Sequence, residues 1–143
     1  IMQILEKAGK VTEGEILFIP REQRPDLERF CRRHGIARKV RRDVWEDLLE
    51  PFLDTWIAPE DERATVERLR EAGFPPEEVA EIRRRLAPLM HAYNFDGMVW
   101  QWAILGLYDL LSAANAPFVD SRLQDALGDP AAFYAWTMAT AAR

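Results

Sequence analysis

The sequence predicts an all-α protein, a single compact bundle of six or seven helices with room for one short N-terminal strand or extended arm. Apolar residues recur at helical spacing in most segments, and proline followed by acidic residues marks several helix starts. Only residues 15–19 resemble a strand, and no second segment is suited to pair with them. The 143 residues favour one domain over 1–143.

The first two expected helices lie in the most basic part of the chain. One follows Pro25 and ends at Gly35, because its apolar residues share one face and glycine is favoured just after a helix. A second is expected from about Ala37 to Glu50, where Pro51 ends or kinks it. Only a short turn separates the two.

The later helices have clear boundary signals. Pro59 and Pro76, each followed by acidic residues, start two of them, and Gly73 ends the first of these. Two short helices are expected after Asp120 and after Asp129. Residues 97–111 are apolar on every side, which is typical of a central helix or of one shared with another subunit. The sequence is therefore also compatible with a homodimer.

Charge is sorted along the chain, although the formal net charge is only −5. Residues 21–42 hold nine basic and three acidic residues, a balance of +6, whereas residues 43–81 hold 13 acidic and three basic residues, a balance of −10. The acidic segment includes Glu60 to Glu71. The candidate partner-binding residues of the basic segment are Arg29, Arg32, Arg33, Arg38, Lys39 and Arg42.

This pattern predicts a small non-enzymatic binding or regulatory protein that engages a macromolecular partner, in the first place a protein, through charge-sorted helical surfaces. A single Cys and the lack of a secretory apolar segment at the start indicate the cytoplasm. The most apolar stretch, from Leu86 to Val119, is interrupted by Asp96 and Asp109, so no membrane partner is expected.

Nucleic-acid binding is an alternative, because a helix, a glycine turn and a second helix over residues 26–50 outline a helix-turn-helix. Its arginines and lysine would neutralise phosphates. Two features oppose this interpretation. Arg41 stands where the motif usually buries an apolar side chain, and acidic residues such as Asp43 and Asp47 follow one turn after the basic ones.

A third hypothesis rests on Arg85 and His91, six residues apart. This spacing resembles the catalytic Arg…His motif of HEPN-type ribonucleases, with Asn94 and Asp96 nearby as polar residues. The resemblance implies an all-helical fold in which the pair lies at a helical dimer interface and cleaves RNA. It covers only these few residues, and Pro88 falls inside the spacing.

No metal site, cofactor or further catalytic residue is expected. Cys31 and His34 share a helical face, but a structural zinc site needs four ligands and the chain has one Cys and two His. Neither serine has the surroundings of a nucleophile, and no glycine-rich phosphate loop occurs. Aromatic residues gather in the last third of the chain, where we expect them to fill the core or, failing that, an oligomer interface.

Overall fold

Helix boundaries follow the proline, aspartate and glycine signals of the sequence in most places. A computed structural model describes residues 16, 18–37, 42–96 and 104–143, and these contain seven α-helices and no strand. The all-α class is therefore confirmed. The strand expected over 15–19 falls partly outside the described residues, because Glu15 and Leu17 are not among them.

The chain separates into two compact units, residues 1–42 and residues 43–143. Unit 1 holds eleven basic and six acidic residues, a balance of +5, and unit 2 holds eight basic and eighteen acidic residues, a balance of −10. The charge reversal thus coincides with the boundary between the units. The single domain over 1–143 stays a prediction, because this division does not decide whether the units fold independently.

The described residues of unit 1 contain one α-helix, α1, which covers Arg24–Arg33 and follows the 3₁₀ helix η1 at Arg21–Gln23. Pro25 occupies the first turn of α1, where its missing N–H costs no helical hydrogen bond. Gly35 then adopts a φ of 65°, and the chain leaves the helix there. None of the residues of α1 is buried.

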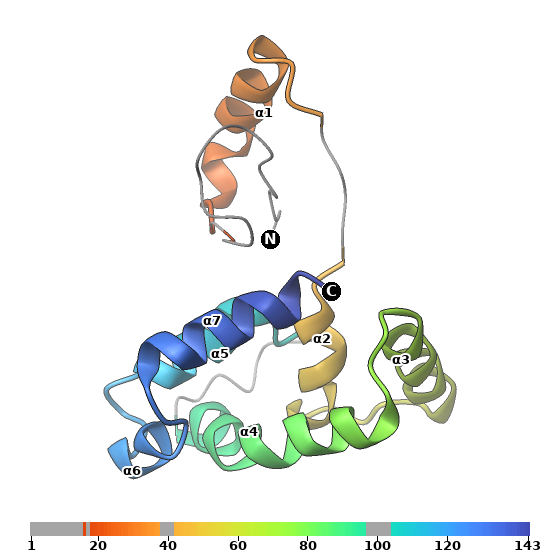
Figure 1. The fold of residues 1–143 in the computed structure, drawn as a ribbon, viewed down its shortest axis with the longest axis vertical. Coiled ribbons are helices and arrows are strands. Elements are labelled where there is room, and N and C mark those ends of the chain that lie inside the picture. Colours follow the sequence, from red (N-terminus) through yellow and green to blue (C-terminus); the bar gives the residue numbers. More distant parts are fainter. Residues whose placement is uncertain (1–15, 17, 38–41, 97–103) are drawn as a thin grey trace. The chain divides into compact units, whose positions relative to one another are not determined.

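Unit 2 contains six α-helices and one 3₁₀ helix among its described residues (Figure 1). They are α2 (Val44–Leu49), η2 (Glu50–Phe52), α3 (Pro59–Glu71), α4 (Pro76–Asp96), α5 (Leu107–Asn115), α6 (Ser121–Asp125) and α7 (Pro130–Ala141). The short helix α2 packs against α3, α4 and α7, and α5 packs against both α4 and α7. A central α2 therefore links the other helices of the unit.

Trp45 of α2 lies at the centre of the core of unit 2. It is fully buried, and its indole N–H donates to the carbonyl oxygen of Thr137 in α7 at 3.1 Å. Its ring meets that of Trp136 edge to face, with centroids 5.4 Å apart. Fully buried leucines on the other helices include Leu86, Leu107 and Leu110.

The carboxylate of Asp43 joins the starts of two helices that are far apart in sequence. One of its oxygens accepts from the backbone N–H of Trp45 at 3.0 Å, and the other accepts from that of Leu107 at 2.9 Å. Asp109 accepts from the N–H of Gly106 at 2.9 Å, so two carboxylates cap the start of α5. A Cβ at Gly106 would lie only 2.9 Å from the Asp43 carboxylate.

Two expected helices have different boundaries in the structure. The helix expected from Ala37 to Glu50 is wrong at its start, because Ala37, Arg42 and Asp43 are not helical and α2 begins at Val44 under the Asp43 cap. The helix expected over 97–111 is wrong at residues 104–106, which are not helical, and α5 begins only after them, at Leu107. Residues 97–103 lie outside the described residues.

Candidate docking surfaces

The surface of α1 is basic, with acidic residues interspersed. Arg24 pairs with Glu28 at 3.1 Å, and Arg29 pairs with Asp26 at 2.9 Å. Both ion pairs are exposed and lie within one helical turn, so each adds little stability. They show that two of the arginines of α1 already lie beside a carboxylate of their own helix.

Arg32 and Arg33 complete the basic surface in the last turn of α1, where cations also favour the helix macrodipole. Both are exposed, and neither has an ion-pair partner among the described residues. Phe30 is 48% exposed beside them, and its ring lies 4.3 Å from that of His34. The end of α1 thus combines free cationic groups with an uncovered aromatic ring.

The six basic residues predicted to bind a partner are only partly described. Arg29, Arg32 and Arg33 lie on α1 and are exposed, as expected. Arg42 is exposed at the end of unit 1. Arg38 and Lys39 lie outside the described residues. The structure therefore brings three of the six together on one helix.

The second helix of the expected helix-turn-helix pair is not available as a recognition helix. Of the six residues of α2, five are buried in unit 2, and the sixth, Glu46, is acidic and half-buried. The basic residues expected at the start of this helix precede α2. A recognition helix needs an exposed face for the DNA groove, and α2 uses its faces to pack against α3, α4 and α7.

The acidic stretch from Glu60 to Glu71 forms most of α3. Glu60, Asp61 and Glu62 are exposed in its first turn, where they complement the positive end of the helix dipole. Near the other end, the guanidinium of Arg70 donates to Glu67 at 2.6 Å, and this hydrogen bond lowers the pKa of Glu67. The exposed surface of α3 is therefore acidic at its start and mixed at its end.

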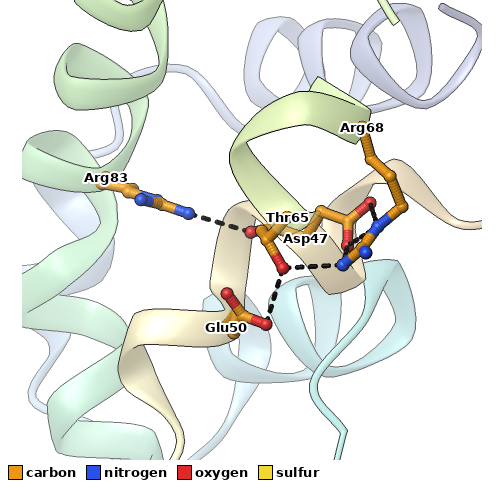
Figure 2. Close-up of polar contacts among 5 residues, drawn as sticks. All are labelled: Asp47, Glu50, Thr65, Arg68 and Arg83. Atoms are coloured by element: carbon orange, nitrogen blue, oxygen red, sulfur yellow. Dashed lines mark hydrogen bonds and ion pairs between the residues drawn. The ribbon is translucent and has the colours of Figure 1, made fainter. Parts of the chain in front are cut away.

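A polar network anchors α3 to the centre of unit 2 (Figure 2). Asp47 of α2 is buried, and its carboxylate accepts three hydrogen bonds from Arg68 of α3, at 2.8, 3.0 and 3.3 Å. Arg68 also donates to the hydroxyl of Thr65, which in turn donates to Glu50 at 2.7 Å. The contact with Asp47 raises the pKa of Arg68.

Arg83 of α4 contacts the backbone of α2 next to this network (Figure 2). It donates to the carbonyl oxygens of Asp47 and Leu48 at 3.0 and 3.1 Å, near the end of α2, where the last carbonyls lack helical partners. Burial lowers the pKa of Arg83. No ion pair of Arg83 is found within the described part of the chain.

Arg85, the first residue of the ribonuclease hypothesis, faces the C-terminal helices. Its guanidinium donates to the carbonyl oxygen of Leu127 at 2.7 Å and lies 4.6 Å from the centre of the Trp136 ring and 5.7 Å from that of Phe133. Arg85 therefore links α4 to α7 through cation–π contacts.

His91 contacts a different part of unit 2. Its ring meets that of Phe52 in η2 at right angles, with centroids 5.4 Å apart. Asn94, expected to assist, is buried and donates to the carbonyl oxygen of Phe52 at 2.9 Å. Arg85 and His91 therefore reach different neighbours within one chain, and the ribonuclease hypothesis stays a prediction.

A pocket of about 320 Å³ lies between α3 and the first half of α4. Its lining includes the buried side chains of Leu69 and Phe74, the exposed Val66 and Ala80, and half-buried Arg83. This pocket was not predicted from the sequence. Its only indication on the exposed face of α3 is Val66, and a single apolar residue on an otherwise charged face does not indicate a pocket.

Trp56 was missed as well. It lies between η2 and α3 and is 83% exposed, the highest exposure among the large apolar residues of the described chain. The indication in the sequence is a tryptophan between Pro51 and Pro59, in a segment without helical periodicity. Tryptophan is one of the residue types enriched among those that dominate binding energy at protein interfaces.

No protein-family model, curated protein or solved structure matches this chain. In the described ranges no helix is long and apolar enough to cross a membrane. Over the same part of the chain, no group of three or more His, Cys, Asp or Glu residues is arranged to hold a metal ion. Cys31 is half-buried, and His34 packs on Phe30.

Proposed function

We propose that this chain is a non-enzymatic cytoplasmic binding protein that engages a protein partner through charge-sorted helical surfaces, with α1 as the docking helix. The observation that carries the proposal is that α1 buries none of its ten residues. Isolated helices of this length are marginal in water. A partner that covers Phe30 and Cys31 would supply the packing that the helix lacks.

The charge of α1 favours an acidic protein over a nucleic acid. Asp26 and Glu28 lie on the same helix as its arginines and would repel a phosphate backbone. A protein surface tolerates such a mixture, because opposite charges pair individually around an apolar centre. Phe30 provides that apolar centre beside Arg33.

Site-specific photocrosslinking tests this proposal. We expect a photoreactive phenylalanine at position 30 to crosslink one defined protein in the native host, identified by mass spectrometry. The same group at Tyr134, an exposed aromatic residue of α7, should not capture that protein. Equal capture from both positions would contradict a docking role for α1.

A charge-reversal pair gives the matched control. Arg32→Glu/Arg33→Glu should abolish crosslinking from position 30 and weaken binding of the purified partner at least tenfold. Arg63→Glu/Arg122→Glu changes the net charge equally on exposed positions of unit 2 and should leave binding unchanged. Equal loss of binding in both variants would show that overall charge, and not the position of Arg32 and Arg33, determines binding.

Nucleic-acid binding is measured in parallel with labelled duplex DNA and duplex RNA. At low salt, we expect any binding detected by fluorescence anisotropy to be the same in the wild type and in Arg32→Glu/Arg33→Glu. Binding that falls steeply with added salt and is lost in Arg32→Glu/Arg33→Glu would replace the protein partner by a nucleic acid.

A further inference from the structure

The turn between α3 and α4 is closed by two backbone hydrogen bonds of its own. The N–H groups of Gly73 and Phe74 donate to the carbonyl oxygens of Arg70 and Leu69, at 3.0 and 2.9 Å. Together these bonds form a Schellman motif, for which Gly73 supplies the positive φ of 82°. The motif uses the N–H of Gly73 but leaves its carbonyl oxygen able to accept from another part of the chain.

Arg143, which follows α7, contacts this turn with three parts of its guanidinium group. Nη1 donates to the carboxylate of Glu78 in the first turn of α4, and Nη2 donates to the carbonyl oxygen of Gly73. The guanidinium carbon lies 3.8 Å from the centre of the Phe74 ring. One side chain therefore joins the end of α7 to the turn and to the start of α4, at positions 65 to 70 residues earlier in the chain.

The three contacts of Arg143 are compatible with one another. A guanidinium group is planar, so its N–H groups donate within the plane while its face stacks on an aromatic ring. Ordering the long side chain costs conformational entropy once for all three contacts. Arg84 provides the contrast, because it is exposed and holds only Glu81 of its own helix, and such a pair adds little stability.

The position of Arg143 allows its contacts to be released locally. Its side chain is 37% exposed, as is that of Glu78, whereas Phe74 between them is only 2% exposed. Elsewhere along its length, α7 packs against α2 and α5. The guanidinium can therefore leave the turn while α7 keeps its place in the core. Local openings of this kind require less free energy than unfolding of the whole unit.

We propose that Arg143 is a strap that holds the α3–α4 turn closed over Phe74, and that its release lets the turn open while the rest of unit 2 stays folded. Phe74 also lines the pocket between α3 and α4. The strap therefore controls how often this apolar side chain becomes accessible. The proposal concerns unit 2 alone and is independent of the docking role of α1.

Amide hydrogen exchange of the full chain, followed by nuclear magnetic resonance, tests the strap. Arg143→Gln should accelerate exchange of the N–H groups of Gly73 and Phe74 about tenfold, because the turn opens more often. The N–H of Leu110, which donates within fully buried α5 packing, should exchange at the wild-type rate. Arg84→Gln removes the same charge from a local pair and should leave the turn unchanged.

Two neighbouring glutamates of α4 give a matched pair of variants. Glu78→Gln should also accelerate exchange at Phe74, whereas Glu77→Gln should not, because Glu77 has no ion pair among the described residues. Since Glu78 acts through Arg143, Glu78→Gln should add little to the effect of Arg143→Gln.

Three results would overturn the strap. The first is unchanged exchange at Gly73 and Phe74 in Arg143→Gln. The second is an equal acceleration at Leu110, which would mean that Arg143 stabilises the whole unit and not the turn. The third is an equal effect of Glu77→Gln and Glu78→Gln, which would assign the effect to the charge of the first turn of α4. Circular dichroism confirms that the variants are folded.

Discussion

The helices α1 and α3 begin and end alike but are anchored differently. Each has a proline in its first turn and is followed by a glycine with positive φ, 65° at Gly35 and 82° at Gly73. Yet α3 buries Thr65 and Leu69, whereas α1 buries nothing. Similar local signals therefore produce one helix held by buried side chains and one helix with no fully buried side chain.

The difference arises from where the arginines find acceptors. On α1, Arg24 and Arg29 pair with carboxylates of the same helix. On α3, Arg68 reaches Asp47 of another helix, 21 residues earlier in the chain. A local pair does not attach a helix to anything, but a long-range pair with a buried carboxylate fixes its position. Charge density alone thus does not distinguish a scaffold helix from a docking helix.

The largest difference in stability between the two helices is expected when an apolar side chain is removed from each. Leu69→Ala should lower the free energy of unfolding by about 2–5 kcal/mol, because the leucine is almost fully buried. Leu27→Ala on α1 should lower it by no more than about 1 kcal/mol, since no residue of α1 is buried. Urea unfolding followed by far-ultraviolet circular dichroism, which reports the helices of both units, measures both. Equal losses would mean that α1 is anchored too.

A smaller effect is expected from the arginines. Arg68→Ala should cost about 2 kcal/mol, because it removes the charge-assisted hydrogen bonds that Arg68 makes to the buried Asp47 carboxylate. Arg32→Ala on α1 should change the unfolding free energy by less than about 0.5 kcal/mol. Chemical unfolding of the two variants under identical conditions makes the comparison. A neutral Arg68→Ala variant would show that the network in Figure 2 does not anchor α3.

The smallest effect concerns the dependence of stability on pH. Burial, together with the nearby Asp43 carboxylate, raises the pKa of Asp109 above its ordinary value. The folded protein therefore holds this proton more tightly than the unfolded chain does, so stability from Asp109 falls as pH rises from the unfolded pKa through the folded one. Asp109→Asn keeps an acceptor for Gly106 and should flatten this part of the curve.

Thermal unfolding between pH 3 and pH 7 measures this difference. The stability of the wild type minus that of Asp109→Asn should decrease with rising pH across that window. Glu67→Gln serves as the control, because the pKa of exposed Glu67 is lowered by Arg70 and its contribution changes in the opposite direction. A difference curve for Asp109 that rises with pH would show that its carboxylate is stabilised on folding.

Helix ends with purely local causes were predictable from the sequence. Gly73 and Pro76 bound α3 and α4 as expected, and Asp129 caps α7 through the N–H of Ala132 at 2.8 Å. The start of α2 was not predictable, because the capping residue Asp43 is held in place partly by Leu107, 64 residues away. Local periodicity favours continuing the helix backwards from there.

In the candidate surfaces, too, features with local causes were predictable and features with long-range causes were not. The exposure of Arg29, Arg32 and Arg33 follows from the amphipathic pattern of α1. The inward direction of Arg68 and the exposure of Trp56 do not follow from such a pattern, because nothing in their own segments distinguishes a half-buried arginine or an exposed tryptophan from the usual arrangement. Only the packing of several helices decides both.

The contact between Asp43 and Gly106 makes two distant positions depend on each other. A methyl group at 106 would press on the carboxylate at 43, and a shorter or uncharged residue at 43 would leave the starts of α2 and α5 without a shared acceptor. In any set of related proteins we therefore expect an acidic residue at 43 to accompany glycine at 106. Where one of the two changes during evolution, the other should change with it.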